Sequence, residues 1–189
     1  MSATDTHIDP DEYLHLALEA VRRDDHGAAL AYLKEGAQRA PQDPRIAYLL
    51  GAEHAQIGLY DRAEAEMQRA IEIDPQMHTA RFQLGLLQMT QGRAGDADST
   101  WQGLDALPEG HAMRSFRDGL KALAADRFAE ARQIIQAGLA VNDFSPELNR
   151  DMENLLQRIP EVQSATDAAS PDATGHVWLN AYQNNDQRD

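Results

Sequence analysis

A spacing of 34 residues recurs along this chain and constrains its fold more than any other feature of the sequence. Pro41 and Pro75 are 34 residues apart, and so are Gly51 and Gly85. Alanine recurs at the same interval through four units, at Ala29, Ala63, Ala97 and Ala131. A fixed period of this length is typical of repeat proteins, in which stacked copies of one supersecondary unit bury a shared core.

Each unit has the apolar pattern of two helices. Apolar residues recur at i, i+3, i+4 and i+7, which predicts a pair of amphipathic helices of about 13 residues each. Two Asp-Pro steps, Asp43-Pro44 and Asp74-Pro75, separate the helices. Proline does not continue a helix, and it pushes the residue before it out of helical geometry. We therefore expect these steps to mark boundaries between helix pairs.

Small residues are expected where the two helices of a pair cross. Gly51 and Gly85 would meet Ala63 and Ala97 there, and residues of this size let two backbones approach closely. A bulky residue at such a crossing would overpack it, at a cost of about 1–3 kcal/mol.

The second unit, RIAYLLGAEHAQIGLYDRAEAEMQRAIEIDP, resembles the tetratricopeptide repeat family. The residues that match the pattern of this family are Leu50, Gly51, Gly58, Tyr60, Ala63, Ala70 and Pro75. Parts of the pattern recur in the first unit (Tyr13, Leu16, Ala17, Ala29, Leu33, Gly36, Pro41), the third (Leu84, Gly85, Gly92, Ala97, Trp101) and the fourth (Gly119, Phe128, Ala131, Gly138). The fourth unit departs from the pattern at Asp118, where a large apolar residue is expected.

The resemblance implies an all-α fold, an α-solenoid in which helix-turn-helix repeats form a right-handed superhelix. It covers residues 10–142 and implies repeats at 10–43, 44–77, 78–110 and 111–144, after a disordered N-terminus at 1–9.

A capping helix is expected at residues 145–159, because the last element of a repeat array needs a polar outer face. Ser145 is a candidate N-cap and Pro146 suits the first helical position. The apolar stripe of this helix is Leu148, Met152, Leu155, Leu156 and Ile159. Residues 160–170 are interpreted as a linker and residues 171–189 as a tail.

In this family the first helix of each pair lines a concave groove, so the resemblance implies a peptide-binding site there. The expected groove residues are Leu14, Leu18, Tyr48, Ala52, Phe82, Leu86, Met89, Phe116 and Leu120, with charge at the margin from Arg45, Arg81, Arg114 and Arg117. The same helical spacing also suits core residues, and for Leu14, Leu120 and Leu123 the two interpretations are equally good.

The chemistry of this strip indicates an apolar ligand. Family members that bind chaperones hold a C-terminal carboxylate with lysines and asparagines. Here the lysine places hold Leu14, Tyr48 and Phe82, and the asparagine places hold Leu18, Ala52 and Leu86. We therefore expect an apolar or amphipathic segment instead, bound as a helix or an extended strand.

The tail contains a short apolar group, Val177, Trp178, Leu179 and Tyr182. A solvated tail has no need of these side chains. The sequence allows three interpretations: docking onto an apolar surface of its own chain or of a second chain in a homodimer, packing beside the capping helix, or a disordered tail with incidental aromatic residues.

Composition argues against several functions. The chain has 17 basic and 31 acidic residues and a net charge of −14, whereas nucleic-acid and anionic-membrane binding need clustered cations. It has no cysteine, and its seven histidines lack metal-ligand spacing. No phosphate-binding glycine loop or nucleophile turn occurs. We therefore expect no catalytic, cofactor or metal site, and not an enzyme.

The sequence thus favours a protein–protein interaction scaffold. The alternative is a small acidic chaperone of the bacterial secretion type, which would hold a helical or unfolded client. The N-terminus is polar and acidic, and no stretch approaches the roughly 18 apolar residues of a membrane span. These features predict a cytoplasmic protein, which we take to be bacterial.

Overall fold

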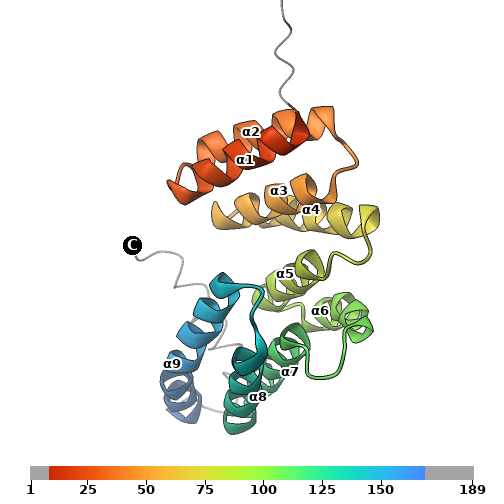
Figure 1. The fold of residues 1–189 in the computed structure, drawn as a ribbon. Coiled ribbons are helices and arrows are strands. Elements are labelled where there is room, and N and C mark those ends of the chain that lie inside the picture. The colour runs from red at the N-terminus through yellow and green to blue at the C-terminus, as the bar shows by residue number, and fades with distance from the viewer. Residues whose placement is uncertain (1–8, 169–189) are drawn as a thin grey trace, which may run out of the picture. The chain divides into compact units, whose positions relative to one another are not determined.

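The computed structural model describes the backbone of residues 9–168 and the side chains of residues 9–160. This part of the chain is all-α, as predicted (Figure 1). Its elements are α1 (Pro10–Arg22), α2 (His26–Arg39), α3 (Pro44–Gln56), α4 (Tyr60–Ile73), α5 (His78–Thr90), α6 (Ala94–Trp101), the 3-10 helix η1 (Gln102–Ala106), α7 (Ala112–Ala124), α8 (Phe128–Val141) and α9 (Pro146–Ala168). The described part of the chain forms two compact units, residues 9–87 (unit 1) and 88–168 (unit 2).

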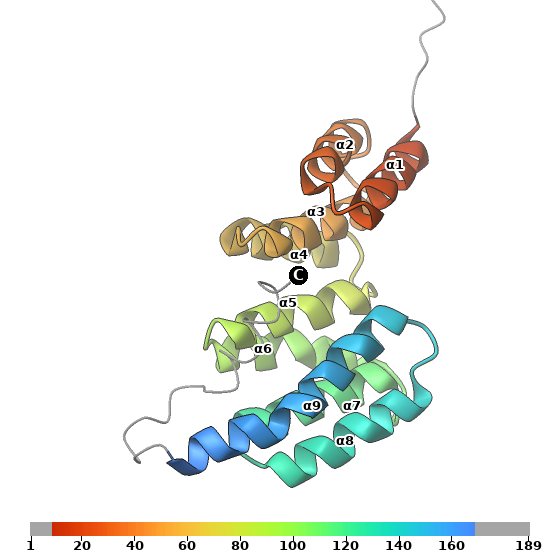
Figure 2. The ribbon, with the colours of Figure 1, turned by 90° about the vertical axis from the view of Figure 1, so that its left-hand side faces the viewer.

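Helices that are consecutive in the chain pack against one another within each unit. In unit 1, α2 packs against both α1 and α3, and α3 packs against α4 (Figures 1 and 2). In unit 2, α8 packs against both α7 and α9. The helices of the pairs have 13 or 14 residues, except that α6 has 8 and continues as the five-residue η1. The residue before Pro108 is extended, with ψ 151°, which prevents a longer helix here.

The turn inside each helix pair has the same backbone geometry. Its central residue is left-handed at Asp24 (φ 59°), Gly58 (φ 75°), Gly92 (φ 76°) and Asp126 (φ 57°), again at intervals of 34. The following N–H donates to a carbonyl five residues earlier in each turn: Asp25 to Ala20 (3.0 Å), Leu59 to His54 (2.8 Å), Arg93 to Gln88 (2.9 Å) and Arg127 to Ala122 (2.9 Å). This is the Schellman motif, which satisfies the carbonyls at a helix end.

The two Asp-Pro steps have different roles. Asp43 is the N-cap of α3, and its Oδ1 accepts a hydrogen bond from the N–H of Arg45 at 2.9 Å. Asp74 instead ends α4, and its Oδ1 accepts from the N–H of Gln76 at 2.9 Å. The next helix begins only at His78. Both steps separate helix pairs as predicted, but only the first starts a helix.

Close approach at the helix crossing is confirmed for Gly51. A Cβ atom at this position would lie 2.7 Å from Cγ of Met67 and 3.0 Å from the carbonyl oxygen of Ala63. The four alanines at the 34-residue interval are fully buried. Glycine at 51 is therefore required by packing between α3 and α4.

Helix α9 begins as predicted but ends later. Ser145 caps it, since its Oγ accepts from the N–H of Leu148 at 3.3 Å. Leu148, Met152, Leu155 and Ile159 are buried and Leu156 is half-buried. The predicted end at 159 is wrong, and so is the predicted linker at 160–170 as far as residue 168, because the helix continues through Pro160 to Ala168. A proline removes one N–H donor, and the residues after it include good helix formers such as Glu, Gln and Ala.

Residues 1–8 and 169–189 lie outside the described part of the chain. The predictions of a disordered N-terminus and of a docking tail at Val177, Trp178, Leu179 and Tyr182 concern those residues and stay predictions.

We predict that Gly51→Ala destabilises the protein by about 1–3 kcal/mol, because the new methyl group would meet the backbone of α4. Gly27→Ala is the matched control, since its Cβ would have only an ordinary contact of 3.5 Å with Asp25. The control should be neutral or slightly stabilising. Urea unfolding followed by circular dichroism compares the two, and equal free energies of unfolding would contradict the packing argument.

Candidate functional site

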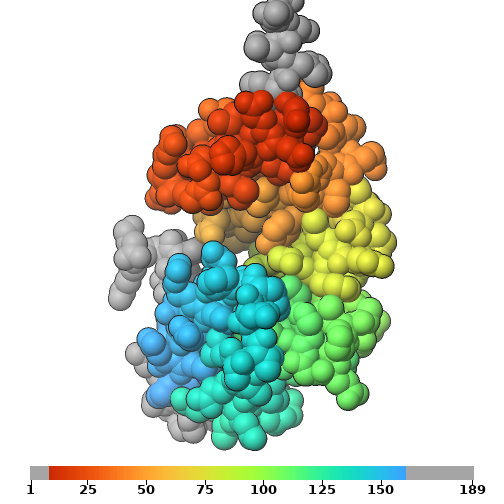
Figure 3. Space-filling model, viewed as in Figure 1, coloured from red at the N-terminus to blue at the C-terminus, as the bar shows by residue number. Residues whose placement is uncertain are grey.

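The accessible part of the predicted groove lies on the first helices of unit 1. Leu18 on α1 is 41% exposed, and Tyr48 and Ala52 on α3 are half-buried. The 34-residue period places Ala52 at the position that Leu18 has in the first repeat. Figure 3 shows α1, in red, at the surface of unit 1. We call Leu18, Tyr48 and Ala52 the α1–α3 strip.

The other predicted groove residues are buried in the structure, and their role in binding stays a prediction. They are Leu14, Phe82, Leu86, Met89, Phe116 and Leu120, none more than 7% exposed. Leu14 belongs to the core cluster that includes Leu33 and Ile46. Phe116 packs against α8, where a Cβ at Gly138 would lie 2.6 Å from its ring. Helical spacing alone does not distinguish a core side chain from a ligand-facing one.

The arginines expected at the groove margin are engaged within the protein. Arg45 pairs with Asp43 at 2.6 Å and Asp11 at 2.7 Å, Arg117 pairs with Asp105 at 2.6 Å, Arg81 donates to the Pro75 carbonyl at 3.2 Å, and Arg114 donates to the Leu107 carbonyl at 2.9 Å. The hydrogen bond from Arg45 lowers the pKa of Asp43, and that from Arg117 lowers the pKa of Asp105. These side chains hold turns and helix ends in place.

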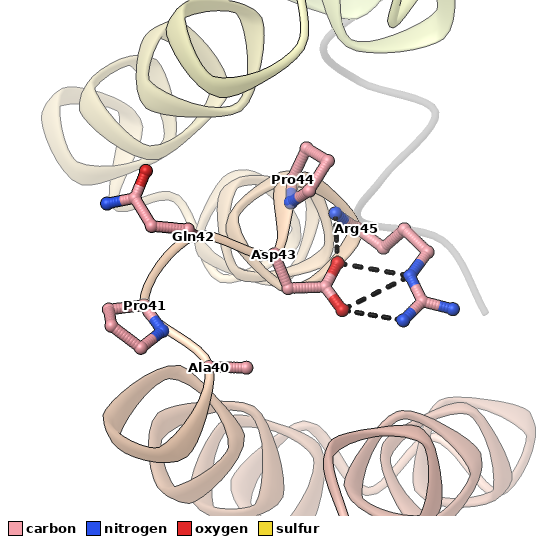
Figure 4. Close-up of a pocket in the computed structure, with 6 residues that line it drawn as sticks. All are labelled: Ala40, Pro41, Gln42, Asp43, Pro44 and Arg45. Atoms are coloured by element: carbon pink, nitrogen blue, oxygen red, sulfur yellow. Dashed lines mark hydrogen bonds and ion pairs between the residues drawn. The ribbon is translucent and has the colours of Figure 1, made fainter.

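A hollow of about 440 Å³ lies at the loop between α2 and α3, lined by residues 40–45 (Figure 4). Its charged groups are Asp43 and Arg45, which bond to each other through both carboxylate oxygens. Since each charge neutralises the other, the hollow offers no free charge to a ligand. We assign no binding role to it.

Sequence reasoning missed a polar cluster between the first two helix pairs. His26, at the start of α2, bonds through Nδ1 to Oε2 of Glu53 on α3 at 2.9 Å. Its Nε2 lies 3.1 Å from Oδ1 of Asp24. The hydrogen bond with Glu53 raises the pKa of His26, against the effect of burial. Glu53 is 4% exposed, so His26 partners a buried carboxylate. No local sequence signal connects two residues so far apart in the chain.

The pKa of His54, the residue next to Glu53, shifts in the opposite direction to that of His26. His54 is 5% exposed, and this burial lowers its pKa. Within residues 9–160, no group of three or more His, Asp and Glu side chains has the arrangement of a metal site. None of the described helices is both long enough and apolar enough to cross a bilayer.

Comparisons with known proteins identify the repeats. Residues 20–83 match the family model described as tetratricopeptide repeat. The solved structure titled "Crystal structure of MamA" is 19% identical, has a TM-score of 0.59, and is matched over 71% of this chain and 79% of that chain. A MamA structure from Desulfovibrio magneticus RS-1 is 16% identical, has a TM-score of 0.58, and is matched over 95% of this chain and 97% of its own. At these identities the similarity shows the fold alone. No curated protein sequence matches the chain.

We predict that His26→Gln has an effect on stability that depends on pH. A raised pKa means that the folded protein binds the proton more tightly, so the stabilisation is present below the unfolded pKa of 6.5 and is lost as pH rises through the higher folded value. The loss caused by the substitution should therefore be larger at about pH 5.5 than at about pH 8.5. Urea unfolding at both pH values measures it.

Glu53→Gln provides the control for this prediction, because it removes the charge that His26 faces. In that background the pH dependence of the His26→Gln effect should shrink. A trend of the same size would assign the effect to other groups.

Proposed function

Because this chain is a tetratricopeptide-repeat protein, a scaffold of the kind that binds other proteins, we propose that it binds an apolar or amphipathic segment on the α1–α3 strip. The observation that supports this most is the 41% exposure of Leu18, together with the partial exposure of Tyr48 and Ala52. These three residues stand on the helices that line the groove in this family. A large apolar side chain with so much exposed surface gains free energy when a ligand covers it.

The strip has few polar groups to bind a charged terminus. The nearest arginine on α3, Arg45, already pairs with two carboxylates of its own chain. Burying a fully exposed side chain of this size contributes about 1.5–3 kcal/mol before the costs of association. Leu18 is 41% exposed and Tyr48 is half-buried, so covering each would contribute part of that range. This range suits a weak partner segment or a tethered one.

We propose the tail of the chain as one such segment. Residues 171–189 carry Val177, Trp178, Leu179 and Tyr182, and this apolar group matches the chemistry of the strip. A tethered segment has an effective concentration in the millimolar range, so weak contacts suffice. Docking of the tail onto the strip of a second copy would produce a homodimer by the same contacts.

We predict that Ala52→Arg exposes Trp178 to solvent, because a long cationic side chain would occupy and charge the strip. Acrylamide quenching of tryptophan fluorescence in the full chain measures this, since Trp101 is only 1% exposed and is already shielded. Quenching should increase about twofold or more, consistent with release of a weakly held segment. Ala31→Arg is the matched control, because Ala31 is exposed on α2 and lies outside the strip.

Two results would contradict the proposal. If acrylamide quenches Trp178 in the unsubstituted chain as strongly as it quenches a free tryptophan, the tail is not held on the strip. If Ala31→Arg increases quenching as much as Ala52→Arg, the effect comes from added charge rather than from the strip. Repeating the measurement over a range of protein concentrations distinguishes docking within one chain from docking between two.

A further inference from the structure

The turn between α3 and α4 exposes a cluster of large apolar side chains. Ile57, Leu59 and Tyr60 are each 40% exposed. They are three of the six large apolar side chains that are exposed among the described residues, and they lie within four consecutive positions. Large apolar side chains that are exposed together in one short segment mark interaction sites more often than scattered single residues do.

The stability of the turn does not account for these side chains. The three equivalent turns have the same Schellman hydrogen bond and the same left-handed residue. At the positions equivalent to 57, 59 and 60 they carry Arg23, Asp25 and His26; Gln91, Arg93 and Ala94; and Ala125, Arg127 and Phe128. Among these residues only Phe128 is large and apolar, and it is buried at 9% exposure. The backbone motif therefore forms without an exposed apolar cluster.

Two unpaired cations lie close to this turn. Among the lysines and arginines of unit 1 within residues 9–87, Lys34 on α2 and Arg62 on α4 are the two without an ion pair or a hydrogen bond. Both are exposed. Burial is the main reason that the pKa of His54 is lowered, but the charges of Lys34 and Arg62 also lower it. Both cations therefore lie near the last turn of α3, which leads directly into Ile57.

Cations are the minority of the charges in this protein, whose net charge is −14. Exposed carboxylates are abundant, yet none of the described ones pairs with Lys34 or Arg62. Asp61 is the exposed carboxylate of this stretch, and it lies in the first turn of α4, where a negative charge favours the helix N-terminus. The carboxylates of Glu66 and Glu53 also affect the pKa of His54, but Glu66 pairs with Arg69 and Glu53 with His26. The α3–α4 turn thus combines exposed apolar side chains with two unpaired cations, Lys34 and Arg62.

We propose that Ile57, Leu59, Tyr60, Lys34 and Arg62 form a second docking surface, for a partner protein segment that carries both carboxylates and large apolar side chains. The carboxylates of the segment would pair with Lys34 and Arg62, and its apolar side chains would cover Ile57, Leu59 and Tyr60. This surface is separate from the α1–α3 strip and does not depend on the proposed function of that strip. Complementary charge would also favour encounter with an acidic segment over a basic one.

The test uses a synthetic peptide that alternates glutamate with leucine and tryptophan, titrated into the isotope-labelled full chain and followed by amide chemical shifts. The largest shifts should occur at residues 57–62. Arg62→Glu and Leu59→Glu should each weaken binding by at least about tenfold. The matched controls are Arg150→Glu and Val141→Glu, which make the same changes at an exposed cation and an exposed apolar residue of unit 2.

Binding that is weakened by the first two substitutions and unaffected by the controls supports the proposal. No binding, shifts confined to residues outside 57–62, or equal effects of all four variants would overturn it. Equal affinity for a peptide with lysine in place of glutamate would overturn the charge pairing. Shifts at Leu18, Tyr48 and Ala52 instead would assign the peptide to the α1–α3 strip.

Discussion

The structure depends on one backbone reversal that is used four times. At positions 24, 58, 92 and 126 a left-handed residue ends a helix, and the next N–H bonds to a carbonyl five residues back. The reversal fixes where each second helix starts relative to the first. It therefore sets which side chains of the pair face each other. Gly51 is at one of these facing positions, where it lets α4 approach α3 closely. Close packing at the crossing recurs with the same period as the turn, because the turn sets the positions of the residues that pack.

This register also explains why so much of the predicted groove is buried. The first helix of a pair packs against its own second helix and against the neighbouring pair. Residues one helical turn apart on this helix therefore differ in exposure. Leu14 belongs to the core between α1, α2 and α3, whereas Leu18 is 41% exposed. Function is therefore proposed for surfaces that the repeat does not use in its core: the α1–α3 strip and the α3–α4 turn. The polar cluster of His26 and Glu53 adds a contact between the first two pairs, through a histidine whose pKa is raised by that hydrogen bond.

The sequence predicted the helix pairs, the crossing at Gly51 and the cap at Ser145, because period, residue size and capping chemistry are local. It marked the reversal at Gly58 and Gly92 through glycine, but not at Asp24 and Asp126, where aspartate takes the same left-handed conformation. It also placed the end of α9 at residue 159, before Pro160, although a helix can continue past a proline. The different burial of Tyr48, which is half-buried, and Phe82, which is 1% exposed, was not predictable, since equivalent positions in a repeat share their spacing but not their neighbours.

Amide hydrogen exchange at the four reversals tests the central claim most directly. The N–H groups of Asp25, Leu59, Arg93 and Arg127 each bond to a carbonyl of the preceding helix, so all four should be protected to a similar degree. Protection at Leu59 and Arg93 with rapid exchange at Asp25 and Arg127 would contradict the account. It would mean that the reversal forms only where the left-handed residue is glycine.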